Sequence, residues 1–311
     1  MVGSILDTIG NTPLVELKRL HPKPGIRLFA KLEGQNPTGS VKDRIARLMV
    51  EAAEADGVLG DGRVILEPSS GNTGVSLAMV ARYRGYNVTI VMPDNVTEER
   101  QALIEAFGAS VVFSDGRYGT NGAIDVAQRM ADEEPDKYVM LYQYGNEANP
   151  RAHYDGTGEE IIRQLPEVDA FVAGLGTGGT LTGVGRRLKE HNPDARVIAV
   201  VPHPEERIQG LRSLEDGFIP PILDTTVLDG QFIITSRESF QMTRELLRVE
   251  SIFAGISSGA VLACALRLAE RMETGNIVCL FADGGWKYLS TGLWTRPLDE
   301  IDAEMGRKIW W

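Results

Sequence analysis

Short apolar runs rich in β-branched residues alternate along the chain with longer segments in which apolar residues recur every three or four positions. The first pattern predicts strands and the second predicts helices. The predicted strands are residues 27–32, 63–67, 87–92, 110–113, 138–142, 169–173, 196–201 and 276–281. The predicted helices are residues 43–55, 73–84, 98–107, 122–132, 181–190, 238–249 and 260–272. Because the two kinds of element alternate, we expect an α/β fold with largely parallel strands and helices on both faces.

These elements fall into two blocks, which suits a chain of 311 residues at roughly 150 residues per domain. The polar stretch at residues 145–158 separates the blocks, and we predict a hinge there. Open parallel sheets bind ligands beyond the carboxyl ends of their strands. Two such blocks therefore predict a ligand cleft between them.

The composition narrows the classes of function. A net charge of −11 disfavours a surface for nucleic acid or anionic membrane. The two cysteines exclude a disulfide scaffold and favour a reducing compartment, and no Cys/His cluster has the spacing of a metal site. No apolar run reaches the roughly 18 residues of a membrane helix, and the first ten residues lack the features of a secretory signal. We therefore expect a cytoplasmic protein without a metal ion.

Glycine is in excess, with 34 residues, and it gathers in short loops that carry the candidate chemistry. The loop Q-N-P-T-G-S-V-K-D-R at residues 35–44 leads into a predicted helix whose first turn holds Lys42. The positive end of the helix dipole lies there, which disfavours the ammonium form and lowers the pKa of the lysine. A neutral amine is what Schiff-base chemistry requires. The alternative is an ordinary surface lysine.

Three other loops open predicted helices. P-S-S-G-N-T-G at residues 68–74 suits either an anion or plain helix capping, and G-I-S-S-G at 255–259 suits a cap. G-L-G-T-G-G-T-L-T-G-V-G at 174–185 contains a dinucleotide-type glycine pattern, but the strand at 196–201 is not followed by the acidic residue that would bind a ribose. A single phosphate on a small cofactor therefore fits better than a nicotinamide dinucleotide. No Ser/His/Asp arrangement or paired carboxylates point to a hydrolase.

Five motifs together resemble one family. They are I-G-N-T-P-L-V at 9–15, K-L-E-G-Q-N-P-T-G-S-V-K-D-R at 31–44, S-G-N-T-G at 70–74, G-T-G-G-T at 176–180 and G-I-S-S-G-A at 255–260. In this order they make nearly the whole chain similar to the cysteine synthases, pyridoxal-phosphate enzymes of the tryptophan-synthase-β type, and most similar to their cysteine synthase B or O-phosphoserine sulfhydrylase branch. The resemblance implies two parallel-sheet α/β domains, residues 41–149 and residues 1–40 together with 150–311, with pyridoxal 5'-phosphate in the cleft between them.

The resemblance also implies roles for single residues. Lys42 matches the lysine that binds the cofactor covalently and acts in catalysis, and Asn72 matches the partner of the cofactor's ring hydroxyl. Ser257 matches the residue that faces the pyridine nitrogen, with the adjacent Ser258 as an alternative. The cofactor's phosphate would be bound by Gly176, Thr177, Gly178, Gly179 and Thr180. The substrate would be bound by Ser69, Ser70, Asn72 and Thr73, at its carboxylate, and by Gln143.

The chemistry that the resemblance implies is a β-replacement. Lys42 takes the Cα proton of an activated L-serine, the leaving group departs from Cβ to give an α-aminoacrylate, and a sulfur donor adds to give L-cysteine. A serine beside the pyridine nitrogen, in place of an acid, makes the cofactor a weaker electron sink and suits this elimination. Intact Lys42 and Asn72 argue against a non-catalytic scaffold protein.

The leaving group is predicted from the segment at residues 208–221, which carries Arg212. An arginine here resembles the branch of the family that accepts O-phosphoserine, or thiosulfate and thiocarboxylated carrier proteins as sulfur donors. Arginine binds phosphate through two parallel hydrogen bonds, so we expect O-phospho-L-serine as the substrate. The alternatives are a solvated loop arginine with O-acetyl-L-serine as the substrate, and the weaker possibility of a serine or threonine dehydratase. As partners the resemblance implies sulfide or another sulfur donor, a second copy in a homodimer, and either a sulfur-carrier protein or a serine acetyltransferase.

The chain ends in K-I-W-W at residues 308–311. Two adjacent tryptophans are seldom left in water. We therefore expect Trp310 and Trp311 either to dock on a partner subunit or to cover the cleft as a lid.

Overall fold

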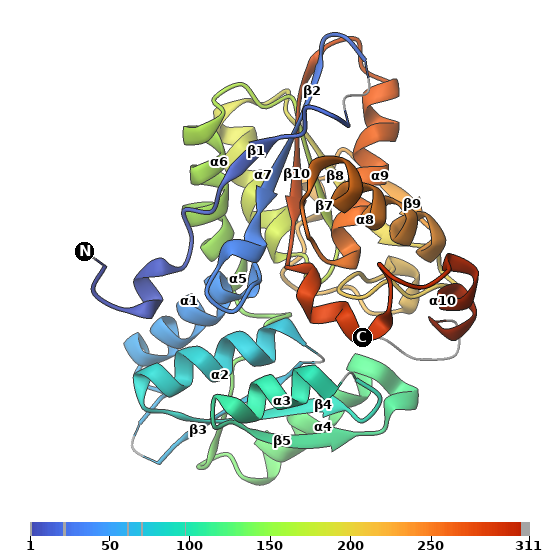
Figure 1. Ribbon diagram of the computed structural model, residues 1–311. Helices are drawn as coiled ribbons and strands as arrows, with labels where there is room; N and C mark the ends of the chain where they lie inside the picture. The colour runs from blue at the N-terminus through green and yellow to red at the C-terminus, as the bar shows by residue number, and fades with distance from the viewer. Residues whose placement is uncertain (1, 21–22, 61, 70, 97, 306–311) are drawn as a thin grey trace.

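The computed structural model describes residues 2–20, 23–60, 62–69, 71–96 and 98–305. Within these ranges the strands form two sheets (Figure 1). The larger has the order β1-β2-β10-β7-β8-β9 and is parallel except for the antiparallel pair β1 and β2, and the smaller is parallel throughout with the order β5-β4-β3-β6. The strands are β1 (Leu14–Glu16), β2 (Ile26–Leu32), β3 (Val64–Pro68), β4 (Asn87–Pro93), β5 (Ser110–Ser114), β6 (Tyr138–Met140), β7 (Ala170–Gly174), β8 (Arg196–Pro202), β9 (Gly230–Ile234) and β10 (Gly275–Phe281).

Every predicted strand and helix is present, with ends within a few residues of the prediction. The α-helices of the described ranges are α1 (Lys42–Ala55), α2 (Asn72–Arg84), α3 (Glu98–Ala106), α4 (Gly119–Glu133), α5 (Ala148–Ala152), α6 (Glu159–Gln164), α7 (Gly179–His191), α8 (Ser236–Glu250), α9 (Ile256–Glu270) and α10 (Leu298–Met305). The pattern did not predict β1, β9, α5, α6 or α10. The predicted α/β class is confirmed.

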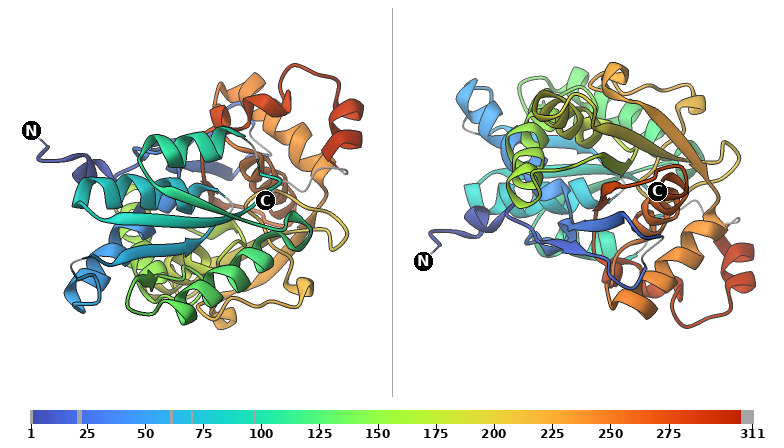
Figure 2. Two further views of the ribbon diagram at one scale, coloured as in Figure 1. Left: turned by 90° about the horizontal axis from the view of Figure 1, so that it is seen from below. Right: turned by 90° about the horizontal axis from the view of Figure 1, so that it is seen from above.

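The central strands of both sheets are buried on both faces, which is why they are continuous apolar runs. Along β2, Leu28 and Ala30 join the core cluster that includes α9, whereas Phe29 between them joins the cluster on the opposite face. The smaller sheet follows the same rule. Ile65 packs with α2 on one face, and Leu66 packs with α4 on the other, and Figure 2 shows these helices on opposite sides of the sheet.

Residues 145–158, which we expected to be a polar hinge, are largely helical. They contain α5 and a π-helix over His153–Gly158 that continues into α6. Three of their polar side chains are buried with internal partners: Asn149 donates to Thr177 Oγ1 at 3.0 Å, and His153 Nδ1 lies 3.0 Å from Thr157 Oγ1. Polarity did not identify this buried part of the segment, because these groups satisfy one another instead of facing water.

The strands of the smaller sheet all lie within residues 64–140. This supports our proposed division into residues 41–149 and residues 1–40 with 150–311. Figure 1 shows α1 and α2 between the smaller sheet below and the larger sheet above. In the part of the chain that is described, no helix is both long and apolar enough to cross a membrane. Trp310 and Trp311 lie outside the described residues.

Candidate active site

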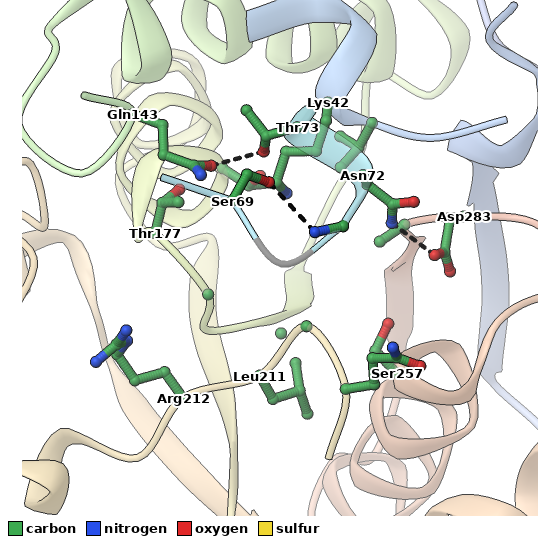
Figure 3. Close-up of a pocket in the computed structure, with 18 of the residues that line it drawn as sticks. Lys42, Ser69, Asn72, Thr73, Gln143, Thr177, Leu211, Arg212, Ser257 and Asp283 are labelled. Atoms are coloured by element: carbon green, nitrogen blue, oxygen red, sulfur yellow. Dashed lines mark hydrogen bonds between the residues drawn. The ribbon is translucent and has the colours of Figure 1, made fainter. Parts of the chain in front are cut away.

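A pocket lies between the two sheets, where the loops after β3, β6, β7 and β10 converge (Figure 3). This is the carboxyl-end position that a parallel sheet predicts for a ligand. The predicted site residues that line it are Lys42, Ser69, Asn72, Thr73, Gln143, Gly176, Thr177, Gly178, Thr180, Arg212 and Ser257. Gly179 begins α7 directly after this loop. Ser70 lies outside the described residues.

Lys42 is the first residue of α1, and its side chain reaches into the pocket. Among the described residues, Lys42 Nζ has no hydrogen-bond or ion-pair partner. Burial lowers the pKa of Lys42, and the charges of Asp283 and Glu33 oppose this shift only in part. The sequence predicted the direction of the shift from the helix dipole, whereas in the structure burial is the larger cause. The result is an amine with an increased neutral fraction.

Hydrogen bonds from its own residues fix the loop after β3, which lines the pocket. Ser69 Oγ accepts hydrogen bonds from the backbone N–H groups of Gly71, at 3.3 Å, and Gly74, at 3.0 Å. Thr73 donates its hydroxyl to Gln143 Oε1 at 2.7 Å, which joins the loop to the residue that follows β6. Because the loop ends at the N-terminus of α2, its remaining N–H groups are placed to bind an anion such as a carboxylate.

Gln143 is itself positioned by a buried acid. Its backbone N–H donates to Glu67 Oε1 at 3.0 Å, and Glu67 Oε2 has no partner among the described residues. Burial raises the pKa of Glu67 to about 8, and the hydrogen bonds from Gln143 and Tyr142 oppose the shift. Tyr142 has a positive φ of 55°, so the chain turns sharply just before Gln143.

The loop after β7 has the shape of a phosphate cradle. Gly178 has a φ of 86°, and a Cβ at Gly179 would lie 1.9 Å from Asn149 Oδ1, so side chains are excluded at both positions. The backbone N–H groups at the start of α7 are thereby left accessible to an anion. Thr180 Oγ1 lies 3.2 Å from His153 Nε2. Burial lowers the pKa of His153 to about 3, so this histidine is neutral.

Two more predictions concern α9 and the loop at residues 208–221. Ser257, in the first turn of α9, lines the pocket, whereas the neighbouring Ser258 is fully buried outside its lining. Arg212 is also buried, so the solvated-arginine alternative is wrong. Its guanidinium lies 4.7 Å from the ring of Phe218 and 5.5 Å from that of Tyr144.

Sequence reasoning missed several residues of the pocket. Asp283, two residues after β10, accepts from Asn72 Nδ2 at 2.7 Å, and Lys287 donates to Asn72 Oδ1 at 2.7 Å. Arg100 and Tyr144 also line the pocket. The available signal was the acid in F-A-D at 281–283, because it follows the carboxyl end of a predicted central strand. No local pattern connects Asn72 with Lys287.

These residues fit pyridoxal 5'-phosphate. A glycine cradle at a helix N-terminus suits its phosphate, and an amine without a carboxylate partner suits covalent attachment. Asn72 and Ser257 line the side of the pocket opposite Thr177 and supply hydrogen-bonding groups there. The lining therefore contains the kinds of groups that the phosphate, the carbonyl carbon and the ring of this cofactor would need.

Comparison with known proteins agrees with this chemistry. The family described as "Pyridoxal-phosphate dependent enzyme" matches residues 5–283. A cysteine synthase of Aquifex aeolicus is 45% identical over 94% of this chain and 92% of its own length. Cysteine synthase B of Escherichia coli is 40% identical over 94% of this chain and 96% of its own. The crystal structure of a cysteine synthase from Entamoeba histolytica has a TM-score of 0.90 and 37% identity, covering 98% of this chain and 96% of that one.

The fold and the pocket thus define a pyridoxal-phosphate-dependent enzyme of fold type II. The identity of 40–45% to cysteine synthases over 94% of the chain assigns it to one family within this class. It belongs to the cysteine synthase family, and its cofactor is pyridoxal 5'-phosphate.

Proposed function

We propose that this enzyme makes L-cysteine by β-replacement on O-phospho-L-serine, with sulfide or another sulfur donor as the second substrate. The observation that carries the choice of substrate is Arg212. It is buried on the wall of the pocket that holds Lys42, and it has no ion pair with a carboxylate among the described residues. A buried cation without a protein anion is a place for an anionic ligand.

Lys42 is proposed as the base. When bound, pyridoxal phosphate supplies an electron sink that stabilises negative charge at the substrate Cα. Lys42 Nζ then removes the Cα proton and later returns a proton to the same carbon. Because burial lowers the pKa of Lys42, the neutral amine is available for this transfer near neutral pH.

The substrate is proposed to be held at both ends. Its carboxylate would bind at Ser69, Ser70, Asn72 and Thr73. Gln143, fixed by Thr73 and by its own backbone bond to Glu67, would orient the amino acid. The leaving phosphate would bind the guanidinium of Arg212, which lies on the segment across the pocket from Asn72 in Figure 3.

Two arrangements keep Arg212 in place. The rings of Tyr144 and Phe218 flank its guanidinium, and the backbone N–H of Arg212 donates to Leu175 O at 2.7 Å, just beyond β7. Nη1 donates to Asn121 Oδ1 at 3.3 Å, a long bond to a neutral group. The Tyr144 hydroxyl also interacts with this guanidinium. A guanidinium has five N–H groups, so others are available to a phosphate. An acetyl ester would use these N–H groups less well.

The test is to mix the purified holoenzyme with O-phospho-L-serine and, separately, with O-acetyl-L-serine, and to record the absorbance of the cofactor through the first seconds. We expect a rapid change with the phosphate ester. Arg212→Ala should lower kcat/KM for the phosphate ester by about 10- to 100-fold, because charge-assisted hydrogen bonds contribute about 1.5–3 kcal/mol. It should change kcat/KM for the acetyl ester less than about threefold.

Arg186→Ala is the matched control, because Arg186 is partly exposed and pairs with Asp224 outside the pocket. An unchanged kcat/KM for the phosphate ester in Arg212→Ala would refute the role of Arg212. A preference of the wild type for the acetyl ester would make the enzyme an O-acetylserine sulfhydrylase. Keto-acid formation without a sulfur donor would indicate a dehydratase.

The proposal also includes a homodimer in the cytoplasm that takes sulfur from a small donor or a sulfur-carrier protein, or that binds a serine acetyltransferase. Its support is the sequence resemblance to the family. Sedimentation of the purified protein would test the dimer, and pull-down with each candidate protein would test the partners.

A further inference from the structure

The side chain of Asn72 is held between two charged residues of opposite sign. Its Oδ1 accepts from Lys287 Nζ at 2.7 Å, and its Nδ2 donates to Asp283 Oδ2 at 2.7 Å. Tyr288 donates its hydroxyl to the same oxygen of Asp283 at 2.5 Å. Asn72, Asp283 and Tyr288 line the pocket, whereas Lys287 is buried behind them and is not part of the lining.

This arrangement fixes the orientation of the carboxamide. A protonated lysine can only donate, and a carboxylate can only accept. The oxygen of Asn72 must therefore face Lys287, and its nitrogen must face Asp283. The amide nitrogen carries two hydrogens, and Asp283 uses one. The other is left as a donor on a residue that lines the pocket, and the reversed amide would place like groups against one another at both contacts.

We propose that Lys287 is a positioning residue, which fixes the carboxamide of Asn72 so that an N–H, and not the C=O, faces the ring oxygen of pyridoxal phosphate. The inference rests on the proposed pyridoxal-phosphate chemistry and on the role that the resemblance implies for Asn72, as the partner of the cofactor's ring hydroxyl. It concerns the cofactor alone, whichever activated serine is the substrate. A donor at this point stabilises the ring oxygen in its deprotonated form, since that form is the stronger acceptor.

The surroundings of Lys287 make the strength of its hydrogen bond to Asn72 depend on pH. The charged groups that face it are Asp283 from its own segment, Asp43 and Lys42 from α1, and Arg100 from α3. Burial lowers the pKa of Lys287 to about 8, with the two acids opposing the shift and the two cations adding to it. Above this pH Lys287 Nζ is a neutral and weaker donor to Asn72 Oδ1, whereas Asp283 still accepts from Asn72 Nδ2.

The experiment uses the holoenzyme without substrate. The absorbance of the bound cofactor is recorded from pH 6.5 to 10, because its bands report whether the ring oxygen is protonated. The wild type should show a spectral change as Lys287 loses its proton, because the weaker donor polarises Asn72 less. Lys287→Arg, which stays protonated throughout, should keep the low-pH spectrum up to pH 10. Lys287→Met should remove the transition and weaken cofactor binding by about tenfold, measured by reconstitution of the apoprotein.

The control is Lys137→Met, which removes the same charge from an exposed lysine paired with Glu134. It should leave the spectrum and the cofactor affinity unchanged. A transition that persists with the same midpoint in Lys287→Arg would overturn the proposal, and that result does not depend on whether Lys287→Met folds. Cofactor affinity within twofold of wild type in a folded Lys287→Met would also overturn it. Because no substrate is present, neither outcome bears on the choice between the phosphate and acetyl esters.

Discussion

Two buried cations, Lys42 and Arg44, lie two residues apart on α1, and their surroundings are opposite in kind. Arg44 belongs to a cluster in which two cations meet two anions. Its Nε donates to Glu33 at 2.7 Å and its Nη1 to Glu160 at 2.7 Å, while Lys31 donates to Glu160 at 2.7 Å. Lys42 is the first residue of the same helix, and its side chain enters the pocket. Among the described residues, its Nζ has no hydrogen-bond partner.

The difference decides what each cation can do. Burial lowers the pKa of Arg44, but Glu33 and Glu160 raise it more, so its charge is fixed. Burial likewise raises the pKa of Glu160, yet Arg44 and Lys31 lower it to about 2. Burial lowers the pKa of Lys42 with only partial compensation from acids. A buried cation with partners therefore joins segments of the fold, and one without partners is available for chemistry.

The largest effect should come from Lys42→Ala. Activity should fall at least about a thousandfold, because the base and the point of cofactor attachment are both lost. The free energy of unfolding of the apoprotein should stay within about 1 kcal/mol of wild type, since an unpaired charge is removed. Steady-state kinetics and urea unfolding measure the two. A large loss of stability would show that Lys42 also supports the fold, and the contrast drawn between Lys42 and Arg44 would then be wrong.

The next largest effect should come from Arg44→Met, and it should be on stability. Removing this guanidinium leaves Glu33 and Glu160 buried with Lys31 as their remaining cation. Breaking a buried ion pair from one side costs about 3–5 kcal/mol, measured by urea unfolding. Arg47→Met is the control, because Arg47 forms a half-exposed pair with Glu51 on the same helix. A cost for Arg44→Met no greater than for Arg47→Met would contradict the structural role of the cluster.

Much of this could be predicted from the sequence. The periodicities located the helix that begins at Lys42, and the short motifs located the loops that follow β3 and β7. Both kinds of signal are local: a strand, a glycine-rich turn and a helix start follow one another within a few residues. Because parallel strands bring their carboxyl ends to one edge, local signals were enough to predict a common pocket.

The unpredicted part depends on pairs that are distant in the sequence. Lys31 and Glu160 are far apart in the chain, as are Asn72 and Lys287, and no spacing rule connects them. The helices within residues 145–158 were missed for the same reason, because the partner of the buried Asn149 is the distant Thr177. A charged or polar residue in a sequence does not show whether its partner is water or another part of the fold.

The smallest effect should come from Lys31→Met, although Lys31 is fully buried in the same cluster as Arg44. Burial lowers the pKa of Lys31 despite its bond to Glu160, so desolvation outweighs the ion pair. Two of the oxygens that accept from Lys31 would also keep another hydrogen-bond donor in Lys31→Met. Thr12 O still accepts from Gln164 Nε2 at 3.0 Å, and Glu160 Oε2 still accepts from Arg44 Nη2 at 2.7 Å.

Methionine is also close to lysine in length and restores apolar contacts in the space that the lysine stem occupies. The free energy of unfolding should therefore fall by only about 1 kcal/mol, against about 3–5 kcal/mol for the same substitution at Arg44. Urea unfolding of the two methionine variants side by side makes the comparison. Equal costs would mean that the cluster acts as one indivisible unit. A larger cost at Arg44 would mean that the arginine, with its bonds to both acids, holds the two anions together and that the lysine is secondary. A larger cost at Lys31 would contradict this.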